Sequence, residues 1–226
     1  MASDDRLDRG MKAQLGERRR AVARGDQPLG WKLGFGTEKA MSGLKISAPL
    51  VGYLLVGARL ESGATCDVSA WVNPRLEPEL AVFLTSDLPA SASRKKAEAA
   101  IGGLGAAIEL VDPDPSADDP EAILEGDIFQ RHVLLGPSRQ ASIADVRLRV
   151  VTNGEEVAAS SDVTELTGDP VELVLHVANT LEAAGEGLTA GAVVICGSIV
   201  PALEVAAGDE VEVELDPLGA LVVRFA

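Results

Sequence analysis

The chain has 226 residues and carries 35 acidic against 20 basic side chains, a formal net charge of -15 at pH 7. This length allows one large domain or two small ones, and the 46% of hydrophobic residues is enough for a sizeable core. The negative charge repels phosphate backbones and anionic lipid surfaces, and only 3% of the residues are aromatic. We therefore expect neither a nucleic acid nor a membrane as a partner.

The two cysteines, Cys66 and Cys196, stand in apolar or small-residue surroundings, without a CxxC pair or a Cys/His cluster. This pattern argues against a zinc site and against a disulfide framework. The charged N-terminal stretch lacks the apolar segment of a secretory signal, and no apolar run approaches the ~20 residues of a spanning helix. The expected location is the cytoplasm.

The first half of the chain mixes helices with strands. Residues 4–24 are rich in charged residues and alanine, and they predict a surface helix that is followed by a glycine-rich stretch at 30–36. The acidic, proline-containing segment 112–120 predicts a loop. The other elements predicted here are strands at 51–56, 76–84 and 106–111 and a helix at 93–104.

Strands dominate the second half. Asn153-Gly154 between apolar runs predicts a hairpin over 147–159, and alternating glutamates and apolar residues predict another over 210–225. Between them, Asp169 and Pro170 begin a helix that ends near Gly185. Because strands outnumber helices and do not alternate with them, we predict an α+β protein with a mixed, mostly antiparallel sheet.

Two glutamates of the segment 75–84 share one face of the predicted strand. Side chains alternate between the faces of a strand, so Glu77 and Glu79 lie together while the apolar side chains between them point the other way. One interpretation is the solvated face of an edge strand, which Pro78 favours. The other is a pair of hard oxygen ligands for a divalent cation such as Mg²⁺.

A third carboxylate, Glu109, stands inside the apolar run 106–111. A buried and unpaired carboxylate is costly, so it needs an arginine, a lysine or a metal ion. A lone salt bridge and a metal site both remain open at this point. Three carboxylates on two neighbouring strands would form an oxygen site with free positions for the carboxylate and keto oxygens of an α-keto acid.

Three other residues are candidates for chemistry. Lys32 lies within the glycine-rich stretch, but neither GxxxxGK[ST] nor GxGxxG is matched, and a turn with an exposed lysine is the alternative. Ser198 follows a predicted strand without matching GxSxG, which favours binding of a substrate oxygen over a nucleophile. His132 is a candidate functional histidine, whereas His176 lies in the apolar stripe of its helix and is expected to be structural.

Together these segments resemble the 2-keto-4-pentenoate hydratase and 4-oxalocrotonate decarboxylase group of the fumarylacetoacetate hydrolase superfamily. The resemblance rests on GWKLGF, PRLEPELAVFL, AIEL and the long block that begins at His176, and it covers residues 30–226. It implies a β-roll with flanking helices, which we divide into an N-terminal helical segment 1–28 and a single catalytic domain 29–226. It also implies a Mg²⁺ or Mn²⁺ ion and a homo-oligomer, with a related decarboxylase as an expected partner.

The resemblance assigns roles by motif position. Lys32 matches a lysine near the substrate, and Ser198 matches a serine that helps bind the substrate carboxylate or keto oxygen. Where typical members have Asp-Asn-Ala-Ser-Ser, this chain has the divergent segment Gly126–His132, in which Asp127 and His132 are the expected catalytic residues beside Lys32. The metal ligands implied by the resemblance are Glu77, Glu79 and Glu109.

The expected activity is that of a divalent-metal-dependent hydratase, a lyase, in the catabolism of aromatic compounds. Its substrate would be a 2-hydroxy-2,4-dienoate or a related short 2-oxo acid, on which the cation acts as a Lewis acid that stabilises an enolate. Decarboxylation of a 2-oxo-diacid is the alternative within the same group. The altered segment Gly126–His132 also allows a non-catalytic paralogue that scaffolds a partner enzyme.

Overall fold

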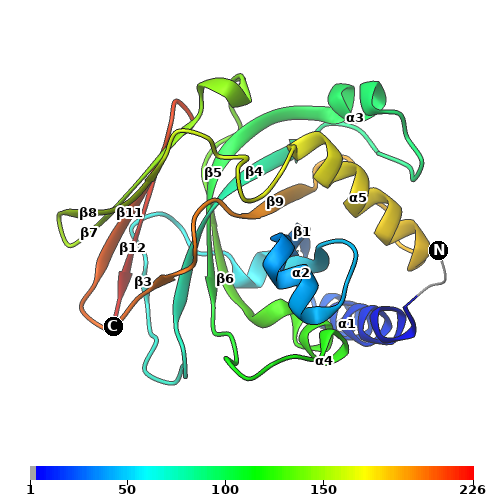
Figure 1. The fold of residues 1–226 in the computed structure, drawn as a ribbon, viewed down its shortest axis with the longest axis horizontal. Helices are drawn as coiled ribbons and strands as arrows, with labels where there is room; N and C mark the ends of the chain where they lie inside the picture. The colour runs from blue at the N-terminus through cyan, green and yellow to red at the C-terminus, as the bar shows by residue number, and fades with distance from the viewer. Residues whose placement is uncertain (1–3) are drawn as a thin grey trace.

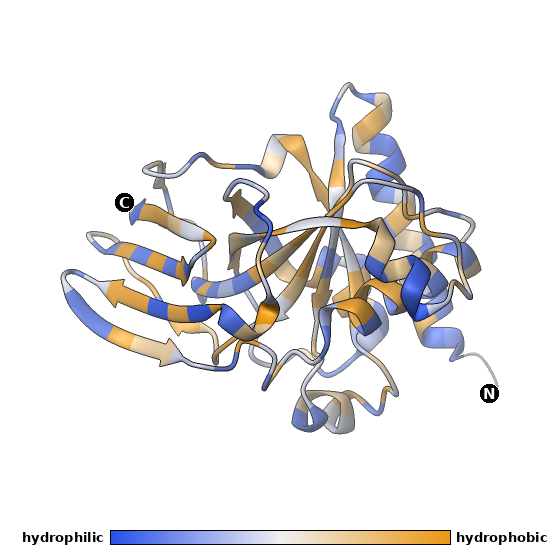
Figure 2. Cartoon of the chain, turned by 90° about the horizontal axis from the view of Figure 1, so that it is seen from above, coloured by the Kyte–Doolittle hydropathy of each residue, from blue (hydrophilic) through white to orange (hydrophobic). Residues whose placement is uncertain are grey.

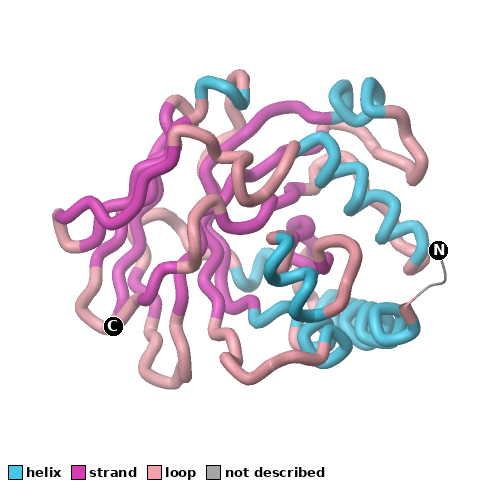
Figure 3. Tube along the Cα trace, in the orientation of Figure 1, coloured by secondary structure: helices cyan, strands magenta, loops and turns pink. Residues whose placement is uncertain are grey.

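The computed structural model describes residues 4–226, in which the strands form two sheets (Figure 1). In the view of Figures 1 and 3 the larger sheet crosses the middle of the molecule, with the smaller sheet to its left and most of the helices to its right. The helices are α1 Asp5–Ala23, α2 Glu38–Leu44, α3 Arg94–Ala100, α4 Pro120–Glu125 and α5 Pro170–Ala183. No helix of the described chain is long and apolar enough to cross a membrane.

The larger sheet has the order β2-β1-β9-β4-β5-β6, and β10 pairs with β4 beyond the end of β9. Its strands are β1 Pro28–Gly34, β2 Leu50–Leu55, β4 Arg75–Leu84, β5 Ile101–Val111, β6 Gln130–Leu135, β9 Val193–Ser198 and β10 Leu203–Glu204. The smaller sheet has the order β3-β12-β11-β7-β8. Its strands are β3 Thr65–Cys66, β7 Arg147–Thr152, β8 Glu155–Ser160, β11 Glu210–Asp216 and β12 Gly219–Phe225.

The pairing confirms the predicted α+β class with a mostly antiparallel sheet. β1 runs parallel to β9 and β12 runs parallel to β3, and the other strand pairs are antiparallel. Both predicted hairpins are present, as β7–β8 and β11–β12. The helix predicted after Asp169 is also present, because the Asp169 side chain accepts from the Val171 N–H and Pro170 occupies the first turn.

The helix that begins at Arg94 is shorter than predicted. It ends at Ala100, and the chain continues as strand β5 from Ile101 instead of remaining helical to residue 104. Glycine is a poor helix former, and Gly102 and Gly103 follow immediately. A Cβ atom on Gly102 would lie 2.1 Å from Cγ2 of Thr85, so these glycines permit a close approach to neighbouring chain segments.

Strand β4 is a central strand, which contradicts the edge-strand interpretation of its sequence. It pairs with β5 on one side and with β9 and β10 on the other. Pro78 is tolerated because it lies between the residues that pair with β10 and those that pair with β9, where the ladder is interrupted. Lys32 likewise lies inside strand β1 and is buried, and is not the exposed lysine of a turn.

The two sheets bury their side chains in different ways. Strands of the smaller sheet alternate between hydrophilic and hydrophobic residues (Figure 2), and on β11 the apolar Val211, Val213 and Leu215 are the buried set. One face of the larger sheet shares an apolar cluster with residues of both the helices and the smaller sheet. Its other face, with Ala81 and Ala107, buries a second, smaller apolar cluster that consists of residues of the larger sheet alone. We call this face the carboxylate face, because Glu77 and Glu79 share it by strand alternation.

Candidate metal centre

The register of β4 against β5 brings the three glutamates together. Glu77 pairs directly with Glu109, and Glu79 pairs with Ala107 on the same face. One carboxylate oxygen from each of the three glutamates lies within 4.8 Å of the others. Glu79 is 0% exposed and Glu109 is 1% exposed, so a solvated strand face does not describe them.

Lys32 completes this cluster from strand β1. It pairs with Gly52 of β2 and Ile195 of β9, and its side chain is 1% exposed. Its ammonium group forms an ion pair with Glu109 and donates to the Ile128 carbonyl oxygen over 3.1 Å. Within residues 4–226 it is the only buried lysine or arginine. Burial acts to lower the pKa of Lys32, but the Glu109 and Asp127 carboxylates outweigh it and raise that pKa.

The carboxyl groups are held where they resist ionisation. Burial, with the nearby Glu109 charge, raises the pKa of Glu77 to about 7. Burial and the two neighbouring glutamates raise the pKa of Glu79 well above its ordinary value. The Gly197 N–H donates to Oε2 of Glu79 over 2.7 Å, while Oε1 of Glu79 is buried without a hydrogen-bond partner in the described structure.

These features fit a hard divalent cation. A buried acceptor atom without a partner is costly, and three converging carboxylates repel one another. Carboxylate oxygens are the preferred ligands of Mg²⁺ and related ions. The orphaned oxygen of Glu79 and the spacing of the three carboxylates therefore suit a bound cation better than they suit an empty cluster.

Asp127 lies at the edge of the cluster in a turn with an unusual backbone. Asp127, Ile128 and Phe129 have φ angles of 51°, 54° and 63°, three left-handed residues in succession. Oδ1 of Asp127 accepts from the Tyr53 N–H over 2.9 Å. Burial raises the pKa of Asp127 to about 7, although Lys32 and this hydrogen bond act in the opposite direction.

The structure brings Ser198 to the cluster but leaves His132 away from it. Ser198 pairs with Glu79 across the β4–β9 ladder, and its hydroxyl donates to the Val200 carbonyl over 2.6 Å. His132 pairs with Leu110, the neighbour of Glu109, and therefore faces the opposite side of the sheet. There its ring stacks on Trp71 with centroids 6.1 Å apart. This position does not support direct participation of His132 in chemistry at the carboxylates.

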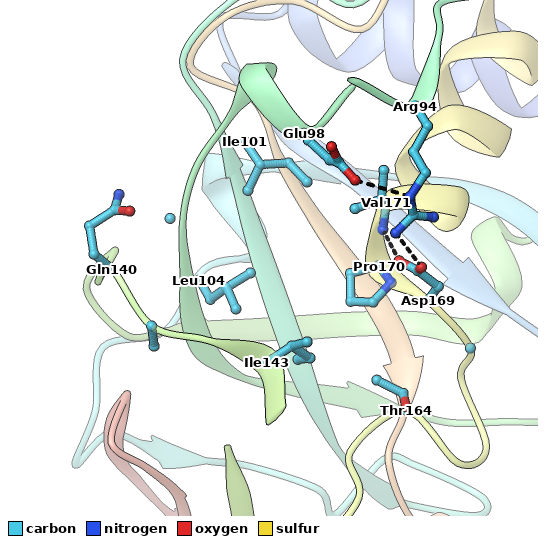
Figure 4. Close-up of a pocket in the computed structure, with 13 residues that line it drawn as sticks. Arg94, Glu98, Ile101, Leu104, Gln140, Ile143, Thr164, Asp169, Pro170 and Val171 are labelled. Atoms are coloured by element: carbon cyan, nitrogen blue, oxygen red, sulfur yellow. Dashed lines mark hydrogen bonds and ion pairs between the residues drawn. The ribbon is translucent and has the colours of Figure 1, made fainter. Parts of the chain in front are cut away.

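Two surface cavities lie apart from the cluster. Figure 4 shows one of about 450 Å³ between α3, the start of α5 and β5, where Arg94 forms ion pairs with Glu98 and Asp169. The other, of about 920 Å³, lies between α1, α5 and the segment before β2. His176 lines it, with Nε2 2.8 Å from the Pro49 carbonyl oxygen, an interaction that fits the structural role expected from sequence.

Sequence patterns did not identify the backbone groups of this site. The N–H groups of Tyr53 and Gly197 and the carbonyl of Ile128 carry no side-chain signal. Gly52 is an indirect signal of the site, because a Cβ atom there would lie 2.8 Å from Oδ1 of Asp127 and 2.9 Å from Cγ of Lys32. A glycine in an otherwise apolar strand is therefore a sign that another group approaches closely.

The larger sheet carries three glutamates and a buried lysine on one face. Comparison with known families agrees with this architecture. The chain belongs to the fumarylacetoacetate (FAA) hydrolase C-terminal family, whose model matches residues 9–226. This result confirms the family that the sequence motifs indicated. Members of the family with named activities include hydratases and decarboxylases.

The relatives are enzymes of two related kinds. The chain is 28% identical to a 4-oxalocrotonate decarboxylase of Pseudomonas putida, over 92% of this chain and 81% of that protein. It is 27% identical to a 2-hydroxyhexa-2,4-dienoate hydratase of Comamonas testosteroni, over 90% and 80%. The structure of 4-oxalocrotonate decarboxylase from Pseudomonas putida G7, complexed with magnesium and adipate, matches with a TM-score of 0.87 and 25% identity. That match covers 94% of this chain and 83% of the other.

Proposed function

We propose that this chain is a divalent-metal-dependent lyase that hydrates a 2-hydroxy-2,4-dienoate or a related short 2-oxo acid. The observation that carries the proposal is the convergence of Glu77, Glu79 and Glu109 beside the buried Lys32. Similarity to the Comamonas testosteroni hydratase supports this choice of reaction.

Glu77, Glu79 and Glu109 are the residues that would hold the cation, Mg²⁺ or Mn²⁺. When bound, such an ion polarises a carbonyl oxygen and stabilises the negative charge that develops on a 2-oxo acid. The Gly197 N–H holds Oε2 of Glu79, which leaves Oε1 as the oxygen without a hydrogen-bond partner in the described structure. Complexes of relatives with magnesium and with calcium support a divalent ion.

Lys32 is the proposed group for proton transfer. Its ammonium lies in a buried site next to Glu109, where it can give a proton to a bound substrate without competition from bulk water. The Asp127 carboxylate helps to keep Lys32 protonated, since it raises the pKa of Lys32 while Lys32 acts to lower the pKa of Asp127. Ser198, opposite Glu79, orients the substrate carboxylate or keto oxygen.

Decarboxylation of a 2-oxo-diacid is the second candidate. It is favoured by the match to 4-oxalocrotonate decarboxylase in both sequence and structure. Both reactions pass through negative charge on the 2-oxo group, so the same carboxylates and lysine serve either one. A non-catalytic scaffold would have no need of a buried carboxylate oxygen without a partner, so Oε1 of Glu79, which has none in the described structure, favours an enzyme.

The proposed setting of the reaction extends the resemblance to the hydratase and decarboxylase group. We propose a role in the catabolism of aromatic compounds in the cytoplasm, by a homo-oligomer that associates with a related decarboxylase. Size-exclusion chromatography with light scattering, of the chain alone and mixed with such a decarboxylase, measures both associations. A monomer in both runs would contradict this part of the proposal.

The test of the function is a substrate screen. Purified protein with Mg²⁺ or Mn²⁺ is incubated with short dienoates and unsaturated 2-oxo-diacids, and loss of the conjugated chromophore is followed by ultraviolet absorbance. Hydration gives a hydroxylated product without CO₂, whereas decarboxylation releases one CO₂ for each substrate consumed. Absence of metal-dependent turnover across the screen would overturn the proposal and favour the scaffold.

A further inference from the structure

The turn Asp127–Phe129 adopts a left-handed backbone conformation that Ile128 and Phe129 disfavour. Left-handed φ angles are uncommon outside glycine, asparagine and aspartate, and they are outliers for a β-branched residue such as Ile128. Three such residues follow one another here, directly before strand β6. Strain of this kind persists only where surrounding structure enforces it, and it concentrates at functional sites.

The surroundings enforce the turn from two strands. The Tyr53 N–H of β2 donates to Oδ1 of Asp127, and a Cβ on the adjacent Gly52 would lie 2.8 Å from the same oxygen. On β1, a Cβ on Gly34 would lie 2.8 Å from Cγ2 of Ile128. Ile128 itself is only 4% exposed. The turn therefore sits directly against β1, which carries Lys32, and against β2, which pairs with it.

The consequence of the turn is where it places the Ile128 carbonyl oxygen. That oxygen accepts a hydrogen bond of 3.1 Å from Nζ of Lys32, whose other acceptor is the Glu109 carboxylate. Glu109 is one of the three proposed metal ligands, so a cation and Lys32 compete for its oxygens. The Ile128 carbonyl is not among the proposed metal ligands, so a cation at the carboxylates would leave it available to accept from Lys32.

We propose that the Asp127–Phe129 turn is a backbone clamp for Lys32, with Ile128 as the positioning residue. While a cation occupies the carboxylates, the Ile128 carbonyl keeps the ammonium group in place on the carboxylate face. The inference rests on the proposed function for the role of Lys32, but its geometry can be tested without any substrate.

The first test is structural. Crystal structures of the wild-type protein with EDTA and with Mg²⁺ are compared at the Lys32 side chain. We expect the contact between Nζ and the Ile128 oxygen to persist near 3 Å after Mg²⁺ engages Glu109. If Nζ leaves the Ile128 oxygen in the Mg²⁺ complex, the clamp is refuted whatever the protein catalyses.

The second test separates the backbone turn from the apolar side chain. Ile128→Gly and Ile128→Asn both remove apolar packing, but glycine loosens the turn, whereas asparagine tolerates the left-handed conformation and retains a side chain. We expect Ile128→Gly to lower kcat by about 10-fold to 100-fold, with KM and the Mg²⁺-induced rise in melting temperature unchanged. Ile128→Asn is expected to keep most of the wild-type kcat.

The matched control is Ser91→Gly, which changes an exposed left-handed residue whose only hydrogen bond within residues 4–226 is from its backbone N–H to Oδ1 of Asn179. It should leave kcat unchanged. Equal kcat for all three variants, or equal loss for Ile128→Gly and Ile128→Asn, would contradict a backbone clamp. If the wild-type protein turns over nothing, the proposed function fails, and the two crystal structures alone decide the clamp.

Discussion

Glu77 and Glu109 are direct cross-strand partners at the centre of a sheet, with both side chains on its carboxylate face. Like charges placed opposite each other on neighbouring strands destabilise a sheet, and here Glu109 is buried and Glu77 half-buried as well. Lys32 supplies one positive charge to Glu109, while Oε1 of Glu79 stays without a partner. The arrangement is therefore unfavourable by itself, and the proposed cation would compensate it.

The first prediction concerns metal binding. Glu77→Gln, Glu79→Gln and Glu109→Gln should each abolish the rise in melting temperature that Mg²⁺ or Mn²⁺ gives the wild-type protein. An ion that binds only the folded state stabilises it by about 2.7 kcal/mol at 100 times its Kd. Differential scanning fluorimetry with millimolar metal or EDTA measures the effect.

Glu155→Gln on strand β8 is the control, because Glu155 is exposed on the smaller sheet. It should retain the full metal response, with a stability change within about 0.5 kcal/mol. If Glu109→Gln alone removed the response while Glu77→Gln and Glu79→Gln kept it, the three glutamates would not form one site.

The second prediction is a pH dependence of the metal-free protein. Glu77 has its pKa raised from 4.5 to about 7, mainly by burial, so the folded state holds more protons than the unfolded state between these values. The stability contributed by the protonated group is complete below about 4.5 and is lost as pH rises through about 7. Urea unfolding in EDTA should therefore show stability falling over this interval.

The same experiment with Glu77→Gln should give a shallower fall, because the amide does not titrate. Saturating Mg²⁺ should reverse the trend, since the ion competes with protons for the carboxylates. A metal-free stability that rises between pH 5 and pH 7 would show that the cluster is already compensated without a cation.

The third prediction concerns Lys32. Lys32→Met keeps an unbranched side chain but removes the charge, and kcat should fall by a factor of roughly 10²–10⁴. Without metal the variant should also lose stability, because Glu109 is left buried without its cation. The Mg²⁺-induced rise in melting temperature should remain, because the lysine is not a ligand. Near-normal turnover would show that Lys32 has no part in the chemistry.

The fourth prediction uses His132 as a negative test. His132→Phe keeps a ring that can stack on Trp71, and His132 faces away from Glu109. We expect kcat within about threefold of the wild-type value, against the 10²–10⁴ expected for loss of a general acid or base. A roughly 10²–10⁴-fold loss of kcat with an unchanged melting temperature would show that His132 is a catalytic residue after all.

Local patterns predicted the parts of the fold that depend on neighbouring residues. The Asn153-Gly154 hairpin and the helix that begins at Asp169 and Pro170 were both found where expected, because turn and cap preferences act within a few residues. The edge-strand interpretation of Pro78 was wrong because the interruption between β9 and β10 is formed by segments far along the chain.

The sequence by itself determined that Glu77 and Glu79 share a face, since strand alternation is a local property, and that a buried Glu109 requires a compensating charge. Only the tertiary structure decided that Glu109 lies opposite Glu77, that Lys32 reaches it from β1, and that His132 faces away. Register and strand order arise from packing between distant segments, and a one-residue shift in register would move a side chain to the other face. The left-handed turn at Ile128 is likewise decided by tertiary structure, because β1 and β2 enforce a conformation that Ile128 and Phe129 disfavour.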